Sequence, residues 1–177
     1  MKFRVPSNFN LRGVTSEDHE FLVELHNDPV VLKNLTHSTP IKMGQHLAWW
    51  ETVRTNPKQA RLIFTVDEER AGFAKFYDID TGNRCCVLGG DIHESFRGRG
   101  YAKYMWSLML SRCFDDWNLN RVSLTTAAYN EVARYVYTRL GFKEEGKLEQ
   151  SLWRNGSFHD QVAMRLLKSE WEAMEIP

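Results

Sequence analysis

The spacing of hydrophobic and polar residues changes several times along the chain, and each change predicts a new element. Runs rich in β-forming residues, separated by turn residues, predict seven strands, at residues 9–13, 61–66, 71–80, 85–93, 121–128, 142–153 and 158–167. Apolar residues that recur every three or four positions predict helices, at residues 15–27, 43–56, 102–117 and 130–140 and around Trp171. Residues 30–40 show neither spacing, and we expect them to be irregular.

The order of these elements predicts how the strands pair. Short turns join the strands at 61–66, 71–80 and 85–93, so we expect antiparallel hairpins. A helix lies between the strands at 85–93 and 121–128, which implies a right-handed parallel crossover. The last two strands form a hairpin around Arg154-Asn155-Gly156-Ser157. The sum is an α/β (α+β) fold with a mixed, mostly antiparallel central sheet of about seven strands and flanking helices.

Two pairs of neighbouring residues stand out within these elements. Leu47, Trp50 and Val53 are expected on one side of their helix, so the adjacent Trp49 must face elsewhere. One of the two tryptophans can therefore contact a ligand, although core packing explains both as well. Gly89-Gly90 weakens the strand that contains it, and glycines at such a place mark a bulge or a close backbone approach.

Residues 97–102, Arg97-Gly98-Arg99-Gly100-Tyr101-Ala102, form what we call the arginine–glycine turn, between a strand and a long helix. Gly98 and Gly100 suit a backbone that turns sharply and comes close to another group. The following helix begins with unpaired N–H groups and the positive end of its dipole. Such a turn suits an anion, above all phosphate. Glycines also occur in plain strand-to-helix connections, so the turn alone leaves both interpretations open.

Composition and charge limit the classes of function. The 177 residues suffice for a substantial core, and we expect one domain over residues 1–177. Lysine plus arginine equal aspartate plus glutamate, at 23 each, which argues against partners such as nucleic acid or an anionic membrane. No apolar run approaches the roughly 20 residues that span a bilayer. The three cysteines form no disulfide or zinc pattern, so we expect a cytoplasmic protein without a metal.

Two separate stretches resemble the GCN5-related N-acetyltransferases, usually shortened to GNAT. The arginine–glycine turn is similar to the family's Q/R-x-x-G-x-G/A motif. Residues 130–142, Asn130-Glu131-Val132-Ala133-Arg134-Tyr135-Val136-Tyr137-Thr138-Arg139-Leu140-Gly141-Phe142, are similar to its N-x-x-A-x-x-x-Y-x-x-x-G-F pattern. The resemblance implies the GNAT fold, in which the parallel fourth and fifth strands splay apart. It also implies acetyl-CoA as the acetyl donor.

The resemblance further implies which residues bind the coenzyme. The pantetheine arm would lie between the splayed strands and pair with backbone groups of Ile92, His93 and Glu94. The pyrophosphate would lie on the backbone of the arginine–glycine turn, that is, on Arg97, Gly98, Arg99, Gly100, Tyr101 and Ala102. Asn130 would hydrogen-bond the coenzyme, and as a good N-cap residue it can also begin its helix.

The implied reaction is direct attack of an amine on the thioester, without a covalent enzyme intermediate. This reaction needs an oxyanion partner, a proton for the leaving thiolate and a neutral amine. The backbone N–H near Ile92 is the expected oxyanion donor. Tyr137, which matches the family's tyrosine near the coenzyme sulfur, is the expected general acid, although it can also be a packed helix tyrosine.

The general base is less determined. Many relatives place a glutamate early in the fourth strand, where this chain has Val87 or its neighbours. Asp91 and His93 alternate onto one face of that strand, so either can take a proton directly or through water, and histidine has the better ordinary pKa. His159 and Asp160, from the last hairpin, are weaker candidates, and water alone is a further alternative.

The acceptor is expected to contact the first two helices and their loop, through His37 and Trp49 or Trp50, which suit a sugar or nucleotide. Residues 26–29 and 45–50 resemble the subgroup that acetylates nucleotide-linked 4-amino sugars. Residues 145–146 and 155–160 resemble the ribosomal-protein N-terminal acetyltransferases. We expect the acceptor to be a small amine, first of all a nucleotide-linked amino sugar. We expect the protein to be a monomer or a homodimer. A protein α-amine acetyltransferase and a non-catalytic acyl-CoA-binding module remain as alternatives.

Overall fold

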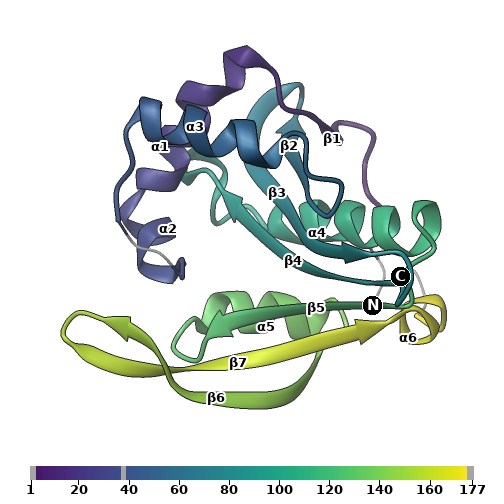
Figure 1. Ribbon diagram of the computed structural model, residues 1–177. Coiled ribbons are helices and arrows are strands. Elements are labelled where there is room, and N and C mark those ends of the chain that lie inside the picture. The colour runs from purple at the N-terminus through teal and green to yellow at the C-terminus, as the bar shows by residue number, and fades with distance from the viewer. Residues whose placement is uncertain (1–2, 37–38, 175–177) are drawn as a thin grey trace.

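The computed structural model describes residues 3–36 and 39–174, which fold around a seven-stranded sheet (Figure 1). The strands lie in the order β1-β2-β3-β4-β5-β7-β6. Their bounds are β1 Phe9–Gly13, β2 Ala60–Val66, β3 Glu69–Asp80, β4 Cys85–Ile92, β5 Arg121–Ala127, β6 Lys143–Arg154 and β7 Ser157–Leu167. Each bound lies within two residues of the prediction, because β-forming runs between turn residues identify strands well.

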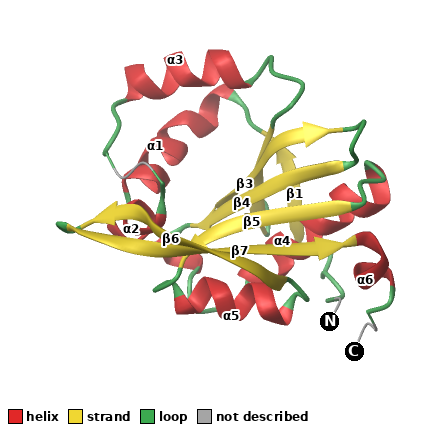
Figure 2. Ribbon diagram, turned by 60° about the horizontal axis from the view of Figure 1, so that its bottom comes forward, coloured by secondary structure: helices red, strands yellow, loops and turns green. Residues whose placement is uncertain are grey.

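Helices cover both faces of the sheet. They are α1 His19–Asn27, α2 Pro29–Asn34, α3 Met43–Val53, α4 Ala102–Ser111, α5 Glu131–Arg139 and α6 Lys168–Glu172, with 3₁₀ turns at Ser16–Asp18 and Glu94–Phe96 and a π-helical turn at Arg112–Asp116. Figure 2 shows α1 and α3 on one side of the sheet and α4 and α5 on the other. Among the described residues, no helix is both long enough and apolar enough to cross a membrane.

Tight turns close two of the hairpins. Asp67 and Glu68, between β2 and β3, have φ angles of 50° and 68°. Asn155 and Gly156, between β6 and β7, have φ angles of 49° and 78°. Two successive positive φ angles match the right-handed twist of the flanking strands, which explains the Asn-Gly pair at the second turn.

β4 and β5 are parallel, but they pair only at their first residues. The register joins Cys85 to Arg121, Cys86 to Val122 and Val87 to Ser123, and the pairing stops there. Beyond Ser123, β5 pairs with β7, whereas β4 continues along β3 as far as Ile92. The sheet is therefore split between β4 and β5 over the second half of both strands, as the resemblance to the family implies.

The glycine pair in β4 allows close packing on both faces. A Cβ atom at Gly90 would lie 2.6 Å from the Cε atom of Met105 on α4, so the methionine side chain occupies the space that glycine leaves. A Cβ atom at Gly89 would lie 3.3 Å from the ring of Tyr77 on the opposite face. The close neighbours of the two glycines are thus side chains, and the register of β4 with β3 shows no bulge at either glycine.

Two local predictions are wrong. Residues 30–40 were expected to be irregular, but residues 30–34 belong to α2, because the carboxylate of Asp28 caps the N–H groups of Val30 and Val31 and Pro29 occupies the first turn. The buried face of α3 is also different, since His46 and Val53 are buried while 41% of Leu47 is exposed. The sequence pattern misplaced this face because a histidine, rather than a leucine, packs inward.

Candidate active site

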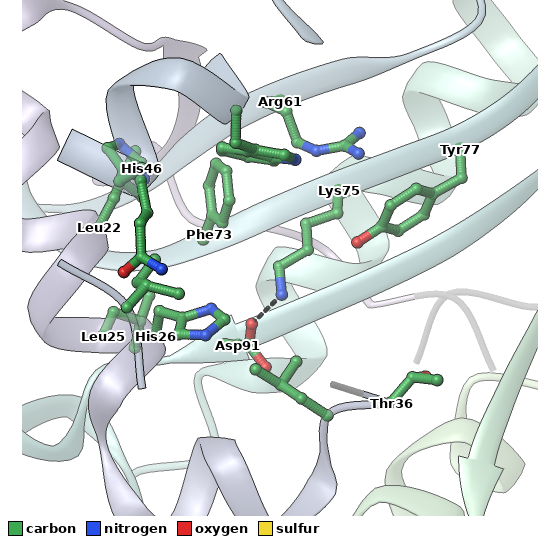
Figure 3. A pocket seen from close by; sticks show the side chains of 14 residues that line it. Leu22, Leu25, His26, Thr36, His46, Arg61, Phe73, Lys75, Tyr77 and Asp91 are labelled. Atoms are coloured by element: carbon green, nitrogen blue, oxygen red, sulfur yellow. Dashed lines mark hydrogen bonds and ion pairs between the residues drawn. The ribbon is translucent and has the colours of Figure 1, made fainter. Parts of the chain in front are cut away.

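A cavity of about 580 Å³, which we call the large cavity, lies between α1, α3 and the face of strands β2–β4 (Figure 3). Its apolar wall includes Leu22 and Leu25 of α1 and Phe73 of β3. Its polar side chains are His26, Thr36, Gln45, His46, Arg61, Lys75, Tyr77 and Asp91. This size and this mixture of an apolar wall with a few polar groups are typical of small-molecule sites.

Asp91, one of the two candidate bases, lies in the wall of the large cavity. Its carboxylate forms a short ion pair with the Nζ atom of Lys75, which projects from the neighbouring strand (Figure 3). Burial alone would lower the pKa of Lys75, but the charge and hydrogen bond of Asp91, together with the nearby Tyr77, outweigh it and hold that pKa above its ordinary value. The ion pair therefore keeps the Asp91 carboxylate in a fixed orientation towards the cavity.

His93, the other candidate base, does not line the large cavity. Its ring lies 5.5 Å from that of Phe21, and its Nε2 atom is 3.6 Å from Oε1 of Glu24. It opens instead onto a smaller hollow of about 320 Å³ that includes Asp28 and Glu94. Because Asp91 is the last but one residue of β4 and His93 follows the strand, the structure separates two residues that strand alternation places together.

Tyr137, the candidate acid, lies on α5 at the other side of β4. Its ring packs edge-on against Trp106, with 4.7 Å between ring centroids, and also contacts Phe142. Burial raises the pKa of Tyr137 above its ordinary value, and the nearby charge of Asp91 raises it further. The phenol therefore keeps its proton at neutral pH and can donate it. The charge of Asp91 is therefore felt at Tyr137, on the other side of β4.

His46 of α3 is a buried residue that the sequence analysis missed. Only 2% of it is exposed, and its Nε2 atom lies 2.9 Å from Nδ1 of His19. Burial, with the charges of His19 and His26, lowers the pKa of His46 to about 4. His46 is therefore neutral at pH 7 and adds no charge to the large cavity.

The two neighbouring tryptophans differ in position. Trp49 lines the large cavity and is 39% exposed, whereas the ring of Trp50 packs against His19 with 5.7 Å between centroids. Trp49 is thus the one that can contact an acceptor. The third expected acceptor residue, His37, lies outside the described residues. The weaker base candidates lie elsewhere, since Asp160 pairs with Lys147 and His159 with Ser157.

The arginine–glycine turn has the geometry that an anion site needs. Gly98 and Gly100 have φ angles of 72° and 74°, which L-residues with side chains rarely adopt. A Cβ atom at either glycine would meet no heavy atom within 4 Å, so the space over the turn is open. The turn leads into α4, whose first N–H groups and positive dipole end face the same space. These features fit the pyrophosphate of a coenzyme A molecule.

The two arginines of the turn have different neighbours. Arg97 is held in the protein, because its Nε donates to the carbonyl of Ile92 and its Nη2 pairs with Asp28 at 2.9 Å. The guanidinium of Arg99 lies over the ring of Phe96 at 5.7 Å. Arg97 therefore links the turn to the cap of α2 and the end of β4, and Arg99 is the better placed of the two for a phosphate.

The end of β4 presents free main-chain groups to the split in the sheet. The N–H of His93 donates to Ala71 of β3. Successive residues of a strand turn their N–H groups to opposite edges, so the N–H of Ile92 faces the split. At the far side of the split, Asn130 caps α5 by accepting from the N–H of Ala133. This confirms the predicted cap, and its contact with a coenzyme stays a prediction.

The end of α2 and the two residues after it form hydrogen bonds with the second half of the chain. Tyr129 donates its hydroxyl hydrogen to the carbonyl of Lys33 at 2.7 Å. Arg154, at the tip of the β6–β7 hairpin, donates to the carbonyls of Leu35 and Thr36. Residues 33–36 are therefore held by side chains that lie 96 to 119 positions further along the chain. Within residues 3–36 and 39–174, no group of three His, Cys, Asp or Glu residues is arranged to hold a metal ion.

Comparison with known proteins identifies similar chains. The sequence profile of the family described as "Acetyltransferase (GNAT) domain" matches residues 8–143. The chain is 36% identical over 117 residues to the "Putative ribosomal N-acetyltransferase YdaF" of Bacillus subtilis (strain 168), a match that covers 66% of this chain but only 63% of that protein. It is 27% identical over 165 residues to the L-amino acid N-acetyltransferase AaaT of Escherichia coli (strain K12), covering 92% and 99% of the two chains.

Solved structures agree with the fold. The spermidine N-acetyltransferase from Vibrio cholerae, in complex with CoA and spermine, superimposes on this chain with a TM-score of 0.89. The two sequences are 22% identical, and the match covers 94% of this chain and 99% of that chain. The predicted fold, with its parallel and splayed central pair of strands, is thereby confirmed.

Proposed function

This chain belongs to the GNAT acetyltransferases and is an acetyl-CoA-dependent N-acetyltransferase, and from this premise we propose that it acetylates a small primary amine bound in the large cavity. The observation that carries the proposal is the position of Asp91. This residue lies in the cavity wall, while its charge also reaches Tyr137 on the far side of β4. A cavity of about 580 Å³ has the size of a small-molecule site.

Each step of the reaction has a residue suited to it. Acetyl-CoA supplies the activated thioester when it is bound at the split between β4 and β5. Asp91 accepts a proton from the ammonium group of the acceptor, which leaves a neutral amine to form the new C–N bond. The N–H of Ile92 stabilises the negative charge that develops on the carbonyl oxygen. Tyr137 donates its proton to the thiolate as the C–S bond breaks, and the attacking nitrogen gives up its second proton to water as the amide forms. Proton exchange with solvent then deprotonates Asp91 and reprotonates Tyr137.

A nucleotide-linked amino sugar remains the first acceptor to test. Trp49 supplies an aromatic face in the cavity wall, and sugars and nucleotide bases pack well against such faces. The charges in the wall disfavour a polyamine, because Arg61 and Lys75 outnumber the single carboxylate of Asp91. A polycation would therefore meet a net positive site.

A second candidate is acetylation of a protein α-amine. The observation that favours it is the 36% identity to the Bacillus subtilis protein, which is the highest identity among the relatives reported above. In this case the acceptor would be an extended peptide end that enters the large cavity, rather than a molecule enclosed by it.

Release of free CoA tests the proposal. Purified protein is incubated with acetyl-CoA and a panel of small amines, and thiol release is followed with a colorimetric reagent. We expect release with at least one small amine and none with peptides that begin with free α-amines. Release with peptides alone, confirmed as a 42-Da mass increase, would support the second candidate instead. No release with any acceptor, despite binding of acetyl-CoA, would contradict the proposed function.

A further inference from the structure

Arg61 of β2 is a buried cation in the wall of the large cavity, and no step of the proposed reaction uses it. Only 7% of its surface is exposed. Its Nη1 atom donates to the carbonyls of Ala60 and Phe76, and its Nη2 atom donates to Oε1 of Gln59. The guanidinium also lies 4.1 Å from the centroid of the Tyr77 ring. All of these neighbours are uncharged.

The described residues leave the charge of Arg61 without a counter-ion. None of their carboxylates forms an ion pair with it, and its Nε atom has no hydrogen-bond partner among them. Burial accordingly lowers the pKa of Arg61. Buried charges in proteins are as a rule paired, because an isolated one is costly. An arginine left unpaired in the wall of a ligand-sized cavity is therefore suited to a charge that a ligand brings.

The rest of the cavity does not supply the missing charge. Lys75, the cross-strand neighbour of Arg61, is already paired with Asp91. His46 is neutral at pH 7, because its pKa is about 4. The wall thus carries two fixed cations and one carboxylate, which leaves one positive charge in excess at Arg61.

Arg61 and Asp91 lie at different ends of the large cavity, with Lys75 between them (Figure 3). Asp91 of β4 is opposite Phe73 of β3, whereas Arg61 of β2 is opposite Lys75, two residues further along β3. From ordinary strand spacings, the Cα atoms of Arg61 and Asp91 are roughly 12 Å apart. An amine at Asp91 and an anion at Arg61 would therefore belong to separate ends of one acceptor.

We propose that Arg61 binds an oxyanion, either phosphate or carboxylate, that the acceptor carries several bonds away from its reactive amine. The inference rests on the proposed function and deepens it by naming the substrate class. Guanidinium groups bind both kinds of oxyanion through paired N–H donors. The class includes phosphorylated or nucleotide-linked amino sugars and ω-amino acids. Polyamines lie outside it, and an α-amino acid, with both groups on one carbon, does not span the cavity.

Matched pairs of amines test this assignment by binding, without the need for turnover. Glucosamine 6-phosphate is compared with glucosamine, and 6-aminohexanoate with hexylamine, so that the two pairs distinguish phosphate from carboxylate. Each compound, and spermidine, is titrated calorimetrically into the protein saturated with CoA. We expect the member that carries the oxyanion in at least one pair to bind about 10-fold more tightly, or more, than its partner without the oxyanion, as for a charged hydrogen-bonded contact. Spermidine should bind more weakly than that anionic member.

Variants assign the preference to Arg61. In Arg61→Gln the anionic preference should fall to about 3-fold or less. Arg61→Lys keeps the charge but loses the paired donors, so its anionic preference should lie between those of the wild type and Arg61→Gln. The exposed Arg84, whose side chain donates to Asn118 far from the large cavity's lining, supplies the control Arg84→Gln, which should keep the wild-type preference. Thermal unfolding and acetyl-CoA affinity verify that each variant is folded.

The outcomes separate this inference from the proposed function. An anionic preference that persists in folded Arg61→Gln would overturn the inference. So would the absence of any preference in both pairs, whether the members bind equally or not at all. CoA release is measured on the same samples. CoA release without an anionic preference would support the proposed function and overturn the inference. An anionic preference without CoA release from any amine would support the inference and contradict the proposed function.

Discussion

The two halves of the active site are built in different ways. On the coenzyme side, the arginine–glycine turn and the end of β4 present main-chain N–H groups and open space at Gly98 and Gly100. On the acceptor side, the large cavity is lined by side chains from α1, α3 and three strands. The first half depends on local backbone geometry, and the second depends on residues that only the folded chain brings together.

This difference explains why the coenzyme half can be the same in enzymes with different acceptors, whereas the acceptor half cannot. Main-chain groups recognise a pyrophosphate in the same way whatever the acceptor is. Side chains in the cavity wall, such as Arg61 and Lys75, decide which acceptor fits and where its charges lie. Substitutions on the two sides should therefore affect different measurements, and the predictions below use this contrast.

The largest effect is expected from a substitution that disrupts the coenzyme side alone. Gly100→Glu places a carboxylate where the pyrophosphate is expected, and like charges in contact cost several kcal/mol. We expect acetyl-CoA affinity, measured by calorimetry, to fall by about 100-fold or more.

The matched control is Gly156→Glu. Gly156 has a φ angle of 78°, close to the 74° of Gly100, and it too has open space around it. The control therefore carries the same backbone strain and charge at the β6–β7 hairpin. Equal loss of affinity in both variants would mean that strain or misfolding, rather than the anion site, is responsible.

The next largest effect is expected from a substitution that disrupts the acceptor side alone. Asp91→Asn removes the proposed base while keeping its shape, so we expect turnover to fall by about 100-fold or more with acetyl-CoA affinity unchanged. Lys75→Gln, which removes the partner of Asp91 but keeps the carboxylate, should lose less. A greater loss in Lys75→Gln than in Asp91→Asn would identify Lys75 as the more important member of the pair.

A smaller effect tests the residue that lies between the two sides. Tyr137→Phe keeps the ring contacts with Trp106 and Phe142 but removes the donor, so turnover should fall by about 10- to 100-fold with little change in melting temperature. Tyr135→Phe, at an exposed position of the same helix, is the control. Wild-type turnover in Tyr137→Phe would show that this tyrosine only packs.

The smallest effect concerns the stability of the acceptor side. His46 has a pKa of about 4 in the folded protein against an ordinary value of 6.5. Between these values the unfolded chain binds a proton that folded His46 does not, so stability falls as the pH falls from 6.5 to 4. The loss should reach about 2–3 kcal/mol.

Urea unfolding across this pH window measures that loss. His46→Gln should remove most of the decrease, whereas His159→Gln, on the β6–β7 hairpin, should keep the wild-type slope. An unchanged slope in His46→Gln would show that other groups cause the acid sensitivity.

The sequence predicts the local geometry of the proposed coenzyme side far better than the make-up of the acceptor side. Gly98, Gly100 and Asn130 act through local conformation, so their spacing in the chain carries the information. Strand bounds are predictable for the same reason. The large cavity is different, since Arg61, His46 and Asp91 come to line one cavity only through the β2–β3–β4 hairpins and the packing of α3.

Some of the missed features had a signal in the chain. Arg61 and Lys75 are cross-strand partners, and each lies two residues from an apolar residue of the same face, Ile63 or Phe73, so the hairpin register places both cations on one face. Pro29 had two opposite interpretations, because proline follows helix ends and also begins helices. Only the capping bonds of Asp28 show that a new helix begins there.

The most direct test of the division between a coenzyme side and an acceptor side is to locate acetyl-CoA on the chain. Hydrogen–deuterium exchange, followed by mass spectrometry, compares the protein with and without saturating acetyl-CoA. We predict slower exchange at the end of β4, in the arginine–glycine turn and at the start of α5, with no change in residues 45–50 of α3. Protection of residues 45–50 without protection of residues 97–103 would contradict the assignment of the coenzyme to the turn.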